Sequence, residues 1–143
     1  MYKRQAYELN EVPIGAVIVK DDTVIGKGYN LRNTKKNPLC HAEIIAMNEA
    51  AINIGDWRLE GCTLYVTVEP CPMCAGAIVQ ARIPLVVFGT RNKKAGCAGS
   101  VLDLFHQERL NHQVQVIEGV QQEECAFMMS SFFRQFRNKK GSL

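Results

Sequence analysis

The sequence lacks any long hydrophobic run. No apolar stretch approaches the roughly 20 residues that a helix needs to cross a bilayer, and residues 1–5 lead into no apolar signal segment. The chain also lacks internal repeats, low-complexity tracts and an interdomain linker. We therefore expect a cytoplasmic protein with a single domain over residues 1–143 and no membrane partner.

An excess of charge of one sign is also missing. The formal net charge is only +3, so composition alone does not predict a polyanionic partner. The distribution of charge is more informative, because basic residues gather in three clusters: Arg32, Lys35 and Lys36; Arg91, Lys93 and Lys94; and Arg134, Arg137, Lys139 and Lys140. One such cluster is typical of a solvated face, whereas three of them modestly favour a nucleic-acid partner.

What is present is an alternating pattern of strands and helices. Apolar patterns and turn residues predict strands at residues 14–19, 24–29, 62–68, 85–89 and 114–117, with Asp21-Asp22 as the first turn. Helical periodicity predicts helices at residues 1–10, 41–54, 72–82 and 121–137, and a basic loop occupies residues 30–39. The strand and helix alternation from residue 62 onward favours an α/β sheet with parallel pairing and helices covering it.

Two short motifs carry the candidate chemistry, His41-Ala42-Glu43 and Pro70-Cys71-Pro72-Met73-Cys74. They supply three metal ligands, His41, Cys71 and Cys74, and one carboxylate, Glu43, without an obvious structural role. A structural zinc site is usually closed by four side chains, whereas a catalytic site keeps three and leaves one position to water. Both motifs start a predicted helix, whose positive end favours the metal-binding thiolate over the thiol. The pattern therefore indicates a hydrolase that uses zinc-bound hydroxide.

Other interpretations of these motifs stay open at this point. C-x-x-C alone also fits a redox pair or half of a closed zinc site, and H-x-E alone is a weaker signal. Cys40 adjoins His41, but neighbouring helical residues point in different directions. The remaining cysteines and histidines lack a second paired motif, and in a cytoplasmic protein the six cysteines would stay reduced. An open site with three ligands is the better interpretation.

Together these residues resemble the zinc-dependent cytidine and purine deaminase superfamily, for which H-x-E with P-C-x-x-C is the known signature. The flanking sequence is similar to the bacterial tRNA-specific adenosine deaminases over nearly the whole chain. The blocks that carry this resemblance are residues 11–17, 28–30, 64–67, 69–71, 75–77, 96–100 and 111–112, and Phe132-Phe133.

The resemblance implies a three-layer α/β/α fold of the cytidine-deaminase type, with a mixed five-stranded sheet and helices on both faces. It implies one Zn²⁺ per subunit and hydrolytic deamination of adenosine to inosine at the wobble position of tRNA anticodon loops. In that reaction zinc-bound hydroxide attacks C6 of adenine and Glu43 is the proton shuttle. It also implies that the partners are a tRNA anticodon stem-loop and a second copy of the chain.

By the same resemblance, Val12, Asn30 and Ala42 form the adenine pocket, and Asn111 and Phe133 meet neighbouring nucleotides. Phe132 shares an apolar helical stripe with Cys125, Met129 and Phe136, so we expect it in the core and Phe133 at the surface. Trp57 is expected to be packed. The chain departs from the family in a short first helix, in Cys40 beside His41, and in Asn92 where an acidic residue is common.

Two alternatives remain on sequence grounds. The first is a free-base or nucleoside deaminase acting on guanine, cytosine or cytidine, because its relatives share the motif around Cys71. The basic loops and the aromatic, basic last helix argue against it. The second is a non-catalytic RNA-binding or scaffold subunit that keeps the zinc for stability, against which Glu43 argues. The sequence leaves the tRNA isoacceptor open.

Overall fold

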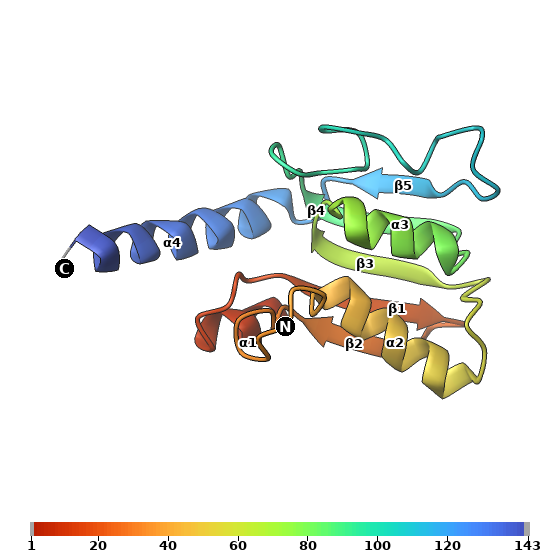
Figure 1. Cartoon of the computed structure of the whole chain (residues 1–143), viewed down its shortest axis with the longest axis horizontal. Helices are drawn as coiled ribbons and strands as arrows, with labels where there is room; N and C mark the ends of the chain where they lie inside the picture. The colour runs from red at the N-terminus through yellow and green to blue at the C-terminus, as the bar shows by residue number, and fades with distance from the viewer. Residues whose placement is uncertain (1, 142–143) are drawn as a thin grey trace.

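The chain folds around one mixed sheet of five strands (Figure 1). The computed structural model describes residues 2–141, and the side chains of residues 3–135. The elements in chain order are α1 (Tyr2–Glu8), β1 (Gly15–Lys20), β2 (Thr23–Tyr29), α2 (Ala42–Ile54), β3 (Thr63–Val68), α3 (Pro72–Gln80), β4 (Leu85–Thr90), β5 (Gln115–Glu118) and α4 (Gln122–Gly141).

The strand order in the sheet is β2-β1-β3-β4-β5. β1 pairs antiparallel with β2 and β3, whereas β3, β4 and β5 run parallel. The hairpin between β1 and β2 turns at Asp21 and Asp22, whose φ angles of 49° and 61° suit a tight turn with the native strand twist. The mixed sheet and the parallel pairing after residue 62 confirm the sequence prediction.

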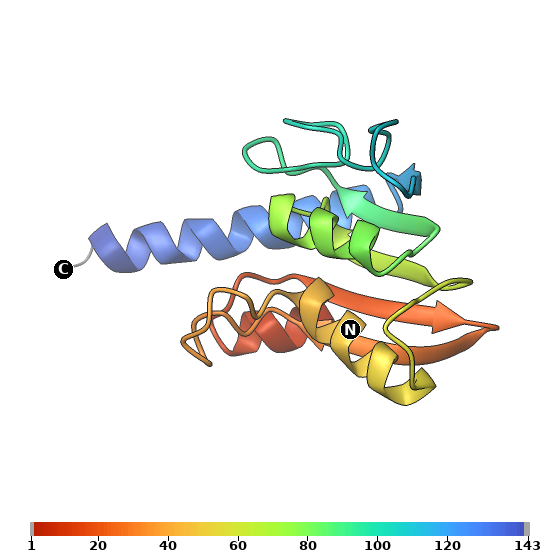
Figure 2. The ribbon, with the colours of Figure 1, turned by 45° about the vertical axis from the view of Figure 1, so that its right-hand side comes forward.

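Helices α2 and α3 lie side by side over one face of the sheet (Figures 1 and 2). Gly26 and Gly28 of β2 let α2 approach closely, because a Cβ atom at either position would lie within 3 Å of the helix backbone. The main core fills the space between this face and the two helices. Its largest fully buried members are Ile18, Leu59, Leu64, Ile78, Ile83, Phe88 and Phe105.

The opposite face carries α1 and the first turns of α4. A cavity of about 240 Å³ remains between these helices and the sheet, beside Val17, Tyr65 and Val87. Further along, α4 extends away from the sheet (Figure 1). Phe132 is 6% exposed and packs edge-on against Tyr7, whereas Phe133 is 45% exposed, which confirms the predicted contrast. Phe136, predicted on the buried stripe, lies outside the described side chains.

The structure differs from the sequence prediction in three places. The segment that joins β4 to β5, residues 91–114, contains no helix, so strand and helix alternate only from β3 to β4. The last helix runs to Gly141 instead of residue 137. Trp57 was expected to pack but is 59% exposed, because it stands beyond the end of α2 with Arg58 and Arg82 over its ring.

Within residues 2–141 we find no helix with the length and apolar character that crossing a membrane requires.

Candidate metal centre and active site

The predicted ligands stand at the starts of the two helices that cover the sheet. His41 and Cys71 are the residues immediately before α2 and α3, both in extended backbone conformation. Neither side chain caps its own helix, although residues at this position commonly do so. Both side chains are therefore free to point toward each other. Cys74 lies one turn into α3 on the same face as Cys71.

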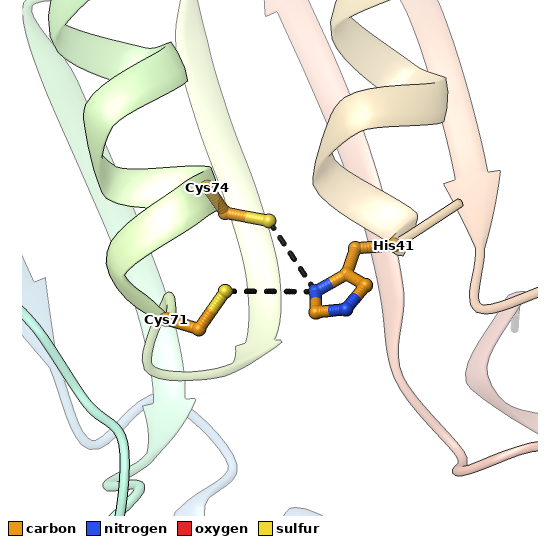
Figure 3. Close-up of side chains that lie close together, drawn as sticks. All are labelled: His41, Cys71 and Cys74. Carbon is orange, nitrogen blue, oxygen red and sulfur yellow. Dashed lines mark hydrogen bonds between the residues drawn. The ribbon is translucent and has the colours of Figure 1, made fainter. Parts of the chain in front are cut away.

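The three side chains converge on one point (Figure 3). Nδ1 of His41 lies 3.6 Å from Sγ of Cys71 and 3.6 Å from Sγ of Cys74. The potential ligand atoms of the three residues all lie within 4.8 Å of one another, and theirs is the one such group among the described residues. Cys40, although adjacent to His41, is not part of it. The arrangement can hold a metal ion.

The pKa values of the two thiols in this group are shifted in opposite directions. A hydrogen bond from the Cys74 thiol lowers the pKa of Cys71 to about 4, aided by His41 and opposed by burial. The same hydrogen bond, together with burial, raises the pKa of Cys74. The pKa of His41 is raised, chiefly by its hydrogen bond with the Cys71 sulfur. Cys71 therefore has thiolate character, and metal binding would release the proton of Cys74.

Glu43 lies beside the ligand group without belonging to it. It is the second residue of α2 and is only 4% exposed. Burial raises its pKa, opposed by hydrogen bonds from its own backbone N–H and from Cys74. A buried carboxyl group with a raised pKa is suited to carrying a proton near neutral pH.

Two of the predicted substrate residues, Asn30 and Ala42, lie near the ligands, and a third, Val12, precedes β1. Asn30 directly follows β2 and is buried, and its side-chain oxygen accepts a hydrogen bond from the backbone N–H of Arg32 at 3.1 Å. The next residue along, Leu31, donates to the carbonyl of Cys40 at 3.0 Å, which brings this segment to the start of α2. Ala42 is fully buried and Val12 half-buried. Their contact with a bound base stays a prediction.

The other two predicted substrate residues lie elsewhere. Asn111 is exposed in the segment before β5, and Phe133 is exposed on α4 with its ring 5.5 Å from that of Phe132. Among the described contacts, none brings either residue to the metal group. Their contact with neighbouring nucleotides also stays a prediction.

The basic clusters lie largely at the surface. The side chains of Arg32, Lys35 and Lys36, and those of Lys93 and Lys94, are exposed. Arg91 forms an ion pair with Glu118 at 3.0 Å. In the third cluster Arg134 is exposed, while Arg137, Lys139 and Lys140 lie outside the described side chains. His106 is exposed and pairs with Asp103, as expected for a surface residue.

Sequence reasoning missed two buried carboxylates, Glu11 and Glu69. They are 3% and 2% exposed, and each accepts hydrogen bonds from the backbone of a basic loop. The only sequence signal is weak, since each lies one or two residues before a proline, at the edge of a predicted strand.

Comparison with known proteins places the fold and the motifs in context. The family profile of MafB19-like deaminases matches residues 1–137. The tRNA-specific adenosine deaminase of Bacillus subtilis is 51% identical over 137 residues, covering 96% of this chain and 85% of that protein.

Solved structures agree with this result. A structure from a study of A-to-I editing by tRNA:A34 deaminases at the wobble position superimposes with a TM-score of 0.85 at 39% identity, covering 89% of this chain and 92% of that chain. A guanine deaminase from Bacillus subtilis superimposes less well, with a TM-score of 0.62 at 30% identity over 96% of this chain and 87% of that chain. The predicted three-layer fold of the cytidine-deaminase type is confirmed.

Proposed function

We propose that this chain, which belongs to the MafB19-like deaminase family and within it to the tRNA-specific adenosine deaminases, deaminates adenosine to inosine at the wobble position of tRNA anticodon loops. One observation carries the proposal: a group of three side chains that can hold a metal ion, His41, Cys71 and Cys74, stands beside a buried carboxyl group that is not part of that group. The similarity to deaminases of guanine is weaker in sequence and in structure, so the free-base alternative is not favoured.

Zinc fits the ligand group. A tetrahedral Zn²⁺ with a Zn–N distance of about 2.0 Å and a Zn–S distance of about 2.3 Å separates the nitrogen and sulfur atoms by about 3.5 Å. Both observed separations between His41 and the cysteines are 3.6 Å. The donor set of one imidazole and two thiolates suits zinc, and three ligands leave one position for water. We propose one Zn²⁺ per subunit, held by these residues.

In the proposed reaction, zinc would activate a water molecule and Glu43 would transfer its protons. Bound zinc supplies a water with a pKa near 7, so that a nucleophile exists at neutral pH. Glu43 accepts the proton of that water and donates it to the ring nitrogen next to C6 of adenine. The water oxygen bonds to C6, and Glu43 then carries the remaining proton of that oxygen to the exocyclic amine, so that the bond between C6 and the amine breaks and ammonia leaves. One carboxyl group can serve both transfers because it is not a metal ligand.

The substrate contacts follow from the positions of the predicted residues. We propose that Asn30, Val12 and Ala42 shape the adenine pocket, since this segment reaches the start of α2 through the hydrogen bond between Leu31 and Cys40. Phe133 is exposed and free to stack on a splayed base, and Asn111 is exposed for an edge contact. The exposed lysines of the two basic loops contact phosphates without reading the sequence.

We further propose that the chain acts as a single deaminase domain, in the cytoplasm and as a homodimer. Its tRNA substrate supports the location, and the match of the family profile to residues 1–137 supports the single domain. Large exposed apolar side chains, among them Ile52 and Phe127, support an interface with a second copy.

An inosine assay tests the proposal. The substrate is an anticodon stem-loop with adenosine at the wobble position, assayed in parallel with free adenosine, guanine, cytosine and cytidine. We expect conversion of the stem-loop and loss of activity when zinc is chelated. Turnover of only a free base or nucleoside would contradict the tRNA assignment.

A further inference from the structure

Two buried carboxylates, Glu11 and Glu69, have no part in the proposed chemistry. Burying a carboxylate costs free energy unless hydrogen bonds satisfy its oxygens. In both residues the hydrogen bonds come from the backbone of a basic loop beside the metal ligands.

Glu11 holds the loop of residues 31–40. Its Oε1 accepts a hydrogen bond from the N–H of Asn33 at 3.1 Å, and its Oε2 accepts one from the N–H of Thr34 at 2.5 Å. The N–H of Glu11 itself donates to the carbonyl of Ala6 at 2.8 Å, which anchors the carboxylate to α1. The loop exposes Arg32, Lys35 and Lys36 and leads directly into His41.

Glu69 holds the loop of residues 91–100 in the same way. Its carboxylate accepts hydrogen bonds from the N–H groups of Asn92 at 3.1 Å, Ala98 at 2.9 Å and Ser100 at 3.1 Å, and from the Ser100 hydroxyl. The loop closes so tightly that a Cβ atom at Gly96 would lie 2.3 Å from Cδ of Glu69.

The second loop is also tied to a metal ligand. The N–H of Cys97 donates to the carbonyl of Pro70 at 2.8 Å, and Pro70 directly precedes Cys71. Each basic loop is therefore fixed by a buried carboxylate; the first loop leads directly into His41, and the second is hydrogen-bonded to Pro70, the residue before Cys71.

We propose that Glu11 and Glu69 are positioning residues that hold the two basic loops in the conformation that binds RNA phosphates, so that the binding surface is formed before the substrate arrives. This inference rests on the proposed function. A loop ordered in advance loses less conformational entropy on binding, which strengthens binding without a new contact. Neither residue belongs to the group of potential metal ligands.

Glu→Gln substitutions at these two positions distinguish a positioning role from a simple effect of charge on RNA binding. Removing a negative charge makes the protein more cationic and should strengthen the binding of a polyanion. The positioning role instead predicts weaker binding, because the glutamine NH₂ group cannot accept a backbone hydrogen bond. The sign of the change therefore separates the two explanations.

The experiment compares the variants Glu11→Gln, Glu69→Gln and Gly96→Ala with a control, Glu60→Gln, in which the same charge is lost at an exposed site. For each we would measure KM and kcat with the anticodon stem-loop, binding of the stem-loop, and zinc content. We expect KM and Kd to rise about tenfold in the first three, with kcat and zinc content within about twofold of the unchanged protein. Glu60→Gln should bind equally well or slightly more tightly.

Hydrogen exchange without RNA supplies a second readout. Amides of residues 32–36 should lose protection only in Glu11→Gln, and those of residues 92–100 only in Glu69→Gln and Gly96→Ala. Unchanged or tighter RNA binding with local loss of protection would overturn the proposal, and so would loss of zinc in step with loss of binding. If the unchanged protein makes no inosine from the stem-loop, the proposed function fails, while hydrogen exchange still decides whether the carboxylates hold the loops.

Discussion

Gly28 of β2 lies directly against Ala42, the first residue of α2. A Cβ atom at Gly28 would stand 2.5 Å from the carbonyl oxygen of Ala42 and 2.9 Å from Cβ of Ile45. No side chain fits this space, so α2 can pack this closely against β2 only where the strand has a glycine. Because His41 and Glu43 flank Ala42, this contact also sets the position of a proposed metal ligand and of the buried acid.

The substitution Gly28→Ala should therefore damage both stability and metal binding. We expect a loss of about 1–3 kcal/mol in the free energy of unfolding, as for overpacked cores, and a weaker hold on zinc. Urea unfolding and metal analysis measure the two effects. The matched control is Gly76→Ala in α3, where nothing lies within 4 Å of the added methyl group. It should be neutral or stabilising by up to about 1 kcal/mol, and equal losses in the two variants would contradict the account.

Substituting Glu43→Gln should abolish turnover while leaving the metal and the fold intact. The amide keeps the shape of the side chain but cannot take a proton from water, so we expect kcat to fall by about 10²–10⁴-fold. Single-turnover assays with the stem-loop and zinc analysis of the same sample provide the comparison. If zinc is lost in parallel with activity, Glu43 has a structural role instead.

Substituting the cysteines near the site should show which of them bind zinc and which do not. Cys71→Ala removes one of three ligands, so the variant should lose its zinc and its activity. Cys40→Ala is the natural control, since Cys40 adjoins His41 in sequence but lies outside the ligand group. It should retain both zinc and turnover. Equal zinc loss in the two variants, measured after dialysis against a weak chelator, would be incompatible with a site of three ligands.

Acidification should destabilise the protein partly through Glu11 and Glu69. Burial alone would raise their pKa values, but hydrogen bonds from Thr34 and Asn33 to Glu11, and from Ser100, Ala98 and Asn92 to Glu69, hold both below the ordinary value of 4.5. The unfolded chain therefore binds protons more readily than the folded chain. The stabilisation is complete above pH 4.5 and is lost as the pH falls through the folded pKa values.

Urea unfolding over a series of decreasing pH values checks this prediction. Metal release also destabilises the protein in acid, so the informative quantity is the difference between the unchanged protein and Glu69→Gln. That difference should shrink as the pH falls below 4.5. Glu60→Gln should follow the unchanged protein throughout, and a constant difference for Glu69→Gln would show that its carboxylate is not charged in the fold.

Much of the site could be predicted from the sequence because its signals are local. His41, Cys71 and Cys74 belong to two short motifs at helix starts, and the structure brings them together. The helical stripe that separates Phe132 from Phe133 is a local pattern too, and their burial agrees with it.

What could not be predicted depends on contacts between distant segments. Glu69 accepts hydrogen bonds from residues 23 to 31 positions away, and the proline that follows it is only a weak sign of burial. The residue type of Trp57 predicts a core position, but its side chain is exposed and its contacts are with Arg58 and Arg82. The loop of residues 91–100 is held by hydrogen bonds to Glu69 and contains no helix or strand. No periodicity in the sequence therefore predicts its conformation.

The measurement that tests the central claim most directly is deamination of the wobble-adenosine stem-loop in water labelled with heavy oxygen. The zinc-loaded protein should produce inosine with the label at its C6 oxygen, together with one equivalent of ammonia, and Glu43→Gln should produce both at least about 10²-fold more slowly. Absence of labelled inosine from the stem-loop, with turnover of free guanine or cytidine by the same preparation, would contradict the account.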